Sequence, residues 1–234
     1  METEVKLSPA PQHIAEKIME KDDLFSSEKT VFSMSATYYD TADRDLKKAG
    51  LTLRLRQENH LSVCCLKYRI NELSRFEAEE QASDIESGIN ALCARDDLSE
   101  SIKNTLKKAK VLPVYSSSFE RVARLISYGK STIELCFDYG FLSQDDRILP
   151  ISEMELELKN GSEEDLISLT ESICNEYKLP ICRESKAQRA SGLTKDAFAN
   201  MRRVASDNLS VNDIFSGRIF LRRTDNEFEY FTKD

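Results

Sequence analysis

Residues 153–159 read Glu-Met-Glu-Leu-Glu-Leu-Lys, a strict alternation of charged and apolar side chains. Alternation with period two predicts a β-strand whose successive side chains point to opposite faces. The carboxylates of Glu153, Glu155 and Glu157 would then share one face, about 7 Å apart along the strand. Because such a row of like charges repels itself, the pattern predicts that cations lie against it.

The same alternation predicts eight strands, at about residues 2–7, 35–41, 50–58, 61–69, 74–81, 117–127, 131–141 and 148–159. Charged side chains are concentrated on one face of six of them: Glu2, Glu4 and Lys6; Thr52, Arg54 and Arg56; Lys67 and Arg69; Arg75, Glu77 and Glu79; Glu134, Cys136 and Asp138; Glu153, Glu155 and Glu157. The segments Glu58-Asn59-His60 and Tyr128-Gly129-Lys130 are expected to form hairpin turns.

Two architectures can hold these charged faces. An open antiparallel sheet commonly has one apolar and one solvated face, but a solvated face rarely stacks like charges so densely. A closed eight-stranded barrel with the charged faces inward would leave room for side chains and one small ligand. Ionised groups lining it would need pairing, water, metal or ligand. The fitting occupant is a polyanion, whose oxygens Arg and Lys bind, accompanied by Mg²⁺ or Mn²⁺ on carboxylates.

The remaining segments predict helices, so the expected fold class is α+β with helices packed outside the barrel. Helices are expected at residues 11–21, in two pieces within 84–110, at 162–177 and at 183–204. Asp97 or Ser99 would cap the second piece within 84–110, and acids after Ser162 would favour a helix start there. We expect one domain over residues 1–204 and an appendage of unknown role over 205–234, which could be docked or loosely ordered.

Nine segments resemble, in order, the motifs of one known family. They are Glu2-Thr3-Glu4-Val5-Lys6 (ExExK), Tyr38-Tyr39-Asp40-Thr41 (YYDT), Leu53-Arg54-Leu55-Arg56 (LRLR), Leu66-Lys67 (the basic strand), Arg75-Phe76-Glu77 (RxE), Phe119-Glu120-Arg121 (FxR), residues 133–140 (IExxxDxG), residues 153–161 (ExELELKxG) and Ser185-Lys186-Ala187-Gln188-Arg189 (SKxxR). Over about residues 1–195 the chain resembles the CYTH, or triphosphate tunnel metalloenzyme, family.

The resemblance implies a closed antiparallel tunnel that hydrolyses a linear triphosphate with Mg²⁺ or Mn²⁺. It implies metal binding by Glu2, Glu4, Glu134, Asp138, Glu155 and Glu157. It implies phosphate binding by Lys6, Arg54, Arg56, Lys67, Arg75, Arg121 and Lys186. We expect Lys6, Arg56, Glu155 and Glu157 to be the catalytic residues.

Several triphosphates remain open as substrates. Inorganic tripolyphosphate, split into pyrophosphate and phosphate, is favoured because no aromatic pair marks a base pocket and the chain has no tryptophan. Thiamine triphosphate hydrolysis and class IV-type adenylyl cyclase activity are the enzymatic alternatives. A polyphosphate-binding module without turnover is the third, although a pure anion binder would not benefit from so many carboxylates.

Composition limits the partners and the location. The net charge of −8 argues against general nucleic-acid binding. No apolar run of membrane-spanning length and no secretory pattern at the N-terminus are found, and the six cysteines lack zinc-site spacing. We therefore expect a cytoplasmic protein with reduced cysteines, without the helical CHAD domain that follows in some relatives. The sequence does not indicate an oligomeric state.

Overall fold

A computed structural model describes residues 2–225 and 227–233. Its long strands match the eight predicted ones, and the largest differences are that β2 and β6 each begin five residues earlier than predicted. They are β1 (Glu2–Leu7), β2 (Thr30–Asp40), β3 (Leu51–Glu58), β4 (Leu61–Arg69), β5 (Ser74–Gln81), β6 (Leu112–Tyr128), β7 (Ser131–Gln144) and β8 (Arg147–Asn160).

The eight strands hydrogen-bond in a cyclic order. The order is β8–β7–β6–β2–β3–β4–β5–β1, and β1 pairs again with β8. The β1–β8, β2–β3, β3–β4, β4–β5 and β7–β8 pairs are antiparallel. The predicted closed eight-stranded antiparallel barrel is therefore confirmed by the strand pairing. Both predicted hairpin turns form, at Asn59 and His60 and at Gly129 and Lys130.

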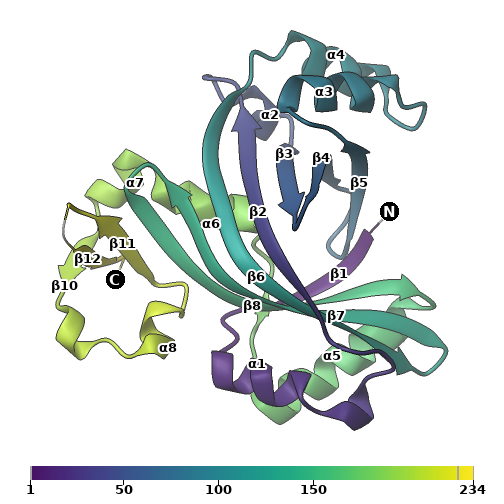
Figure 1. Cartoon of the computed structure of the whole chain (residues 1–234), viewed down its shortest axis with the longest axis vertical. Coiled ribbons are helices and arrows are strands. Elements are labelled where there is room, and N and C mark those ends of the chain that lie inside the picture. The colour runs from purple at the N-terminus through teal and green to yellow at the C-terminus, as the bar shows by residue number, and fades with distance from the viewer. Residues whose placement is uncertain (1, 226, 234) are drawn as a thin grey trace. The chain divides into compact units, whose positions relative to one another are not determined.

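The chain divides into two compact units, and Figure 1 labels their helices and strands. Unit 1 comprises Glu2 and residues 33–118, and unit 2 comprises residues 3–32, 119–225 and 227–233. The strands β1, β2 and β6 each contribute residues to both units.

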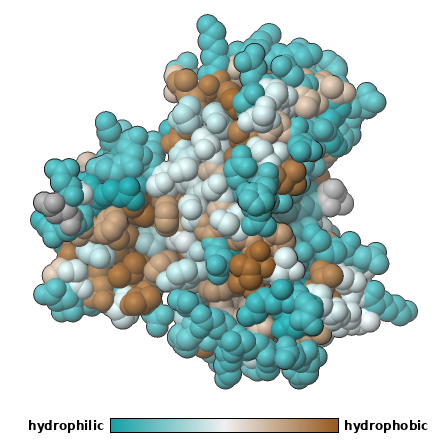
Figure 2. Space-filling model, in the orientation of Figure 1, coloured by the Kyte–Doolittle hydropathy of each residue, from teal (hydrophilic) through white to brown (hydrophobic). Residues whose placement is uncertain are grey.

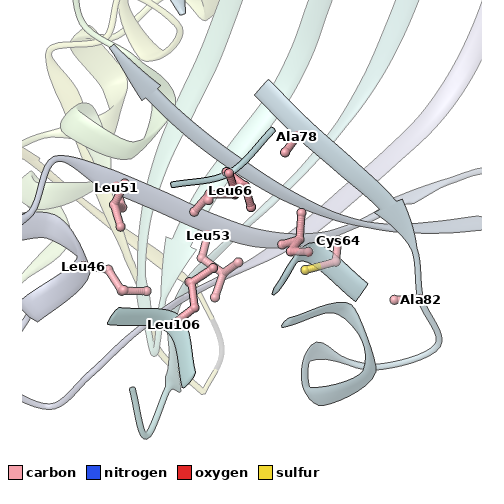
Figure 3. Packing of buried hydrophobic residues seen from close by; sticks show 10 residues of the cluster. Leu46, Leu51, Leu53, Cys64, Leu66, Ala78, Ala82 and Leu106 are labelled. Carbon is pink, nitrogen blue, oxygen red and sulfur yellow. The ribbon is translucent and has the colours of Figure 1, made fainter. Parts of the chain in front are cut away.

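Unit 1 buries the apolar face of β3, β4 and β5 under three helices. These are α2 (Asp45–Lys48), α3 (Ile85–Ala94) and α4 (Glu100–Lys108), and the cluster includes Leu53 and Leu66 (Figure 3). Gly88 lets α3 approach β4 closely, since a Cβ there would lie 2.3 Å from the Cβ of Cys64. The side chain of Ser99 caps α4, as one of the two predicted caps, through the backbone N–H of Ile102.

Leu66 provides a test of this core. Replacing Leu66, which is fully buried, with alanine should lower the unfolding free energy by about 2–5 kcal/mol, because methylene contacts are lost and a cavity remains. Leu61→Ala on the same strand is the matched control, since Leu61 is 42% exposed and should change stability by at most about 0.5–1 kcal/mol. Urea unfolding measures both. Equal losses in the two variants would contradict the assigned face.

Unit 2 buries the apolar face of β7 and β8 against two helices. These are α1 (Gln12–Met19), followed by the 3₁₀ turn Asp22–Leu24, and α5 (Glu163–Tyr177), which Ser162 caps through the N–H of Asp165. Leu135 and Leu156, neighbours in the β7–β8 register, are fully buried. The charged residues that alternate with these leucines along β7 and β8 therefore point to the opposite face.

The helix predicted over residues 183–204 is wrong as one continuous element. The segment contains the short helices α6 (Lys186–Ala190) and α7 (Lys195–Ala199), the 3₁₀ turn Ser191–Leu193 and the strand β10 (Arg202–Val204). Thr194 takes an extended conformation and caps α7, which interrupts the helix. A two-residue strand, β9 (Ile181–Cys182), precedes it and pairs with β1.

Residues 205–234 form regular structure in their described part. They contain the 3₁₀ turn Ser206–Asn208, α8 (Val211–Ile214), β11 (Ile219–Arg223) and β12 (Phe228–Thr232). β11 pairs with β8, and the ring of Phe215 stacks on Tyr139 of β7 with centroids 4.2 Å apart. Figure 2 shows hydrophobic side chains over this segment, where Val211 is 60% exposed. That it is an appendage to a domain over 1–204 stays a prediction.

Candidate active site

Unit 1 carries a face of alternating bases and acids on β3, β4 and β5. The ammonium of Lys67 lies 2.8 Å from Glu2 and 2.9 Å from Glu77. Arg56 contacts Glu58 at 2.6 Å and Glu79 at 2.8 Å. Arg54 lies 3.6 Å from Glu77, and Arg75 shares the face of Glu77 on β5. The structure thus brings five predicted residues, Glu2, Arg54, Arg56, Lys67 and Arg75, onto one charged face, which we call the unit 1 cluster.

Two donors in the unit 1 cluster lack an acceptor. The Nε atoms of Arg54 and Arg56 are buried and have no hydrogen-bond partner among the described residues. Burial by itself lowers the pKa of Arg54, but the neighbouring Cys65, Tyr38 and Glu77 raise it well above the ordinary arginine value. A buried, unsatisfied donor is costly. Two such guanidinium donors side by side on one strand fit oxygen atoms of an anion such as phosphate.

Unit 2 contains a more deeply buried network, which we call the unit 2 cluster. It joins three carboxylates, Asp138, Glu153 and Glu155, to four cations, Lys6, Arg121, Lys186 and Arg189. Arg121 binds both oxygens of Asp138 at 2.7 Å, and its Nη2 also donates to Glu155 at 2.6 Å. Lys186 donates to Asp138 at 2.7 Å, and Lys6 lies 2.5 Å from Glu155.

Glu155 and Lys186 stay ionised near neutral pH because groups of opposite charge surround each of them. Burial by itself raises the pKa of Glu155, but Lys186, Lys6 and Arg121 hold it well below the ordinary value. Burial lowers the pKa of Lys186, but Asp138, Glu153 and Glu155 raise it above the ordinary lysine value. The cluster therefore presents fixed charges, with one more cation than carboxylates among the described residues. Such preorganised cations can stabilise negative charge on a bound anion without reorganising.

A row of carboxylates crosses three neighbouring strands beside the unit 2 cluster. Glu4 of β1 is the register partner of Glu157 on β8, and Glu157 is in turn the partner of Glu134 on β7. Register partners on antiparallel strands lie about 4.5–5.5 Å apart at Cα, so these side chains are neighbours. Lys159 contacts Glu157 at 3.0 Å and Glu134 at 3.6 Å. We call Glu4, Glu134 and Glu157 the carboxylate row.

The two acidic groups of unit 2 differ in how well they suit a divalent cation. Asp138, Glu153 and Glu155 each offer an oxygen within 4.8 Å of the others, but lysine and arginine already contact those oxygens. Asp138 is completely buried, and both of its oxygens bind Arg121. The carboxylate row has the oxygen donors that Mg²⁺ and Mn²⁺ prefer, and Lys159 contacts Glu134 and Glu157 of the row. Both groups therefore offer carboxylate oxygen, and the oxygens of Asp138, Glu153 and Glu155 are already bound by bases.

The thiols of Cys65 and Cys136 lie on the two charged faces. The thiol of Cys65 donates to Glu77 and that of Cys136 to Glu134, at 3.0 and 3.4 Å. Burial raises the pKa of Cys65 to about 12 and also raises that of Cys136, so neither forms the reactive thiolate near neutral pH.

Alkylation should follow this burial. In the folded protein at mildly alkaline pH, iodoacetamide should label the partly exposed Cys93, Cys174 and Cys182 and should leave Cys65 and Cys136 unmodified until denaturant is added. Peptide mass spectrometry with time measures the order. Labelling of Cys65 or Cys136 before these three in the folded chain would contradict the assigned burial.

Residues 1–191 match the family model of the CYTH domain. The chain belongs to the CYTH family. A CYTH relative from Haemophilus influenzae, described as an inorganic triphosphatase, is 29% identical over 197 residues, which cover 80% of this chain and 51% of the relative. The chain thus spans about half the length of that curated relative.

Two solved structures share the CYTH fold at low sequence identity. A protein from Pyrococcus horikoshii superposes with a TM-score of 0.53 at 18% identity, over 80% of this chain and 97% of its own. A candidate adenylate cyclase from Bacillus halodurans gives a TM-score of 0.52 at 22% identity, over 81% and 96%. These likenesses concern the fold alone. No helix within residues 2–225 and 227–233 has the length and apolar composition that crossing a bilayer requires.

Sequence reasoning placed its site residues on the charged faces but missed two members of the unit 2 cluster. Glu153 shares a predicted face with Glu155, and Arg189 belongs to the SKxxR segment, but neither is among the predicted site residues. Strand parity indicated Glu153, and the spacing of three residues from Lys186 indicated Arg189, because residues three apart lie on one helix face.

Proposed function

We propose that this CYTH protein hydrolyses a linear triphosphate and that its substrate is inorganic tripolyphosphate, which yields pyrophosphate and phosphate. The observation that carries the proposal is the unit 2 cluster, in which fixed cations outnumber the carboxylates that hold them. The unsatisfied Nε atoms of Arg54 and Arg56 support it from unit 1. The relative described as an inorganic triphosphatase points to the same chemistry.

The bases have separate tasks in this proposal. Lys6, Arg121 and Lys186 bind phosphate oxygens and neutralise the charge that develops as the bridging bond breaks. Glu155 and Asp138 hold these three bases in place through the contacts described above. In unit 1, Arg54, Arg56, Lys67 and Arg75 supply further phosphate-binding groups, with Glu2 as a partner of Lys67. Positioning and charge neutralisation are the main requirements of phosphoryl transfer.

Of the six predicted metal ligands, Glu4, Glu134 and Glu157 of the carboxylate row would hold Mg²⁺ or Mn²⁺; their places opposite one another in the strand register support this choice. When bound, such an ion polarises a phosphoryl oxygen and lowers the pKa of bound water. The choice between the two ions stays open, since both prefer carboxylate oxygen.

A substrate panel tests the proposed function. Tripolyphosphate, ATP, thiamine triphosphate and longer polyphosphate are each incubated with Mg²⁺ and with Mn²⁺, and phosphate, pyrophosphate and cyclic AMP are measured. We expect the highest kcat/KM with tripolyphosphate. A higher value with thiamine triphosphate, or cyclic AMP from ATP, would replace the proposed substrate. Binding of tripolyphosphate by calorimetry without turnover would indicate a binding module.

Location and partners complete the proposal. All six cysteines are free thiols, which is consistent with the cytoplasm as the place of action. The net charge of −8 argues against nucleic acid as a partner, and the cations of the unit 2 cluster suit a small anionic substrate.

A further inference from the structure

Glu153 is the most completely enclosed member of the unit 2 cluster that the proposed chemistry leaves without a task. It lies on β8, two residues before Glu155, and its side chain has no exposed surface. An isolated carboxylate in such a place would be strongly destabilising. Lys6, Lys186 and Arg189 all contact it, and together they occupy both of its oxygens. Glu153 is therefore enclosed by three cations within the cluster.

The two oxygens of Glu153 divide its partners between them. Oε1 accepts from Lys6, at 3.3 Å, and from Lys186. Oε2 accepts from Nη2 of Arg189, whose Nη1 also donates to Ser8 at 3.4 Å. Because Lys186 and Arg189 are three residues apart on α6, Glu153 binds the same face of that helix twice. One carboxylate thus links β1, β8 and α6.

This arrangement sets the positions of the two lysines. Lys6 and Lys186 both contact Oε1 of Glu153 and Oε1 of Glu155, so two ammonium groups share two carboxylates. Without the charge of Glu153, the four cations of the cluster would face only Glu155 and Asp138. Their mutual repulsion would then move the lysine side chains, which are long and flexible. The cluster's positive charge would increase while its geometry loosened.

We propose that Glu153 is a positioning residue that holds Lys6 and Lys186 in register with the phosphate oxygens, with Arg189 as its anchor on α6. The inference rests on the proposed function, because it assigns Glu153 a task in the same reaction. Glu153 acts through the lysines and does not bind metal, since Lys6, Lys186 and Arg189 already contact both of its oxygens.

The proposal predicts that loss of the Glu153 charge lowers kcat without weakening the binding of tripolyphosphate. Glu153→Gln keeps the side-chain shape and removes the charge, so kcat for tripolyphosphate should fall by about ten-fold or more through misplaced lysines. The Kd for tripolyphosphate, measured by calorimetry in EDTA, should stay within about two-fold or tighten, because the cluster gains positive charge. Glu171→Gln, on the exposed face of α5, is the matched control and should change neither.

The double variant Glu153→Gln/Arg189→Gln separates positioning from folding. The double variant again has one more cation than carboxylates in the cluster, as in the wild type. It should therefore recover much of the melting temperature lost in the single variant. Its kcat should stay low because Glu153 no longer holds the lysines. Wild-type kcat in either variant would overturn the proposal, and so would a rise in Kd that matches the fall in kcat. If the wild-type chain turns over tripolyphosphate and these results fail, the proposed function stands and the role of Glu153 falls. Absence of wild-type turnover would contradict both.

Discussion

Replacing Arg121 with alanine is expected to lower the unfolding free energy by about 3–5 kcal/mol, because a buried ion pair loses one partner. Asp138 is completely buried, and Arg121 binds both of its oxygens, so the variant leaves Asp138 with Lys186 as its remaining cation in the unit 2 cluster. Turnover of tripolyphosphate should fall by about 10²–10³-fold, since a preorganised donor to phosphate oxygen is lost.

Arg121→Lys is the informative control for this prediction. Lysine keeps the charge but cannot bind both oxygens of Asp138 in the planar, two-pronged geometry of arginine. Stability and turnover of Arg121→Lys should therefore lie between those of the wild type and the alanine variant. Urea unfolding and steady-state kinetics measure the two effects. An alanine variant with wild-type stability would contradict the paired geometry of Arg121 and Asp138.

Replacing Glu4 with glutamine is expected to have the second large effect, and it should fall on metal use. Glu4 belongs to the carboxylate row with Glu157 and Glu134, where an amide keeps the shape but offers a weaker ligand to Mg²⁺ or Mn²⁺. At limiting metal, turnover should fall by about 10²-fold, because charge stabilisation of several kcal/mol depends on the ion. Raising the metal concentration should restore part of it.

Stability distinguishes this loss from misfolding. An amide keeps the shape of the Glu4 side chain. The metal-free Glu4→Gln variant should therefore remain folded and unfold cooperatively in urea, while its half-maximal metal concentration rises. Glu171→Gln on α5 is the matched acidic control and should leave metal dependence unchanged. A Glu4→Gln variant with wild-type metal dependence would remove Glu4 from the metal-holding group.

Strand positions could be predicted from the sequence because period-two alternation is strong wherever one face is charged and the other buried. The alternation around Glu153, Glu155 and Glu157 predicted β8 to within one residue at each end. Short elements such as β9 and α8 have too few residues for any periodicity to be recognised. The break between α6 and α7 escaped prediction because Lys, Arg and Ala favour helix locally, while the cap at Thr194 interrupts it.

The charged faces of the site could also be predicted, but the pairing within them could not. Alternation predicts that Asp138 and Glu155 both lie on charged strand faces, and the family resemblance implies that both bind metal. In the structure, however, both oxygens of Asp138 bind Arg121, a residue from another strand. Such cross-strand contacts decide which carboxylates are neutralised by bases and which could bind a metal ion. Alternation along a single strand does not predict these contacts.

The most direct test of the account follows the products of tripolyphosphate by ³¹P NMR, with Mg²⁺ or Mn²⁺ and with EDTA. We predict one pyrophosphate and one phosphate per tripolyphosphate consumed when metal is present, and no turnover in EDTA. Folded wild-type protein that leaves tripolyphosphate intact with both metals, or that hydrolyses it equally well in EDTA, would contradict the proposal that this CYTH protein is a metal-dependent triphosphatase.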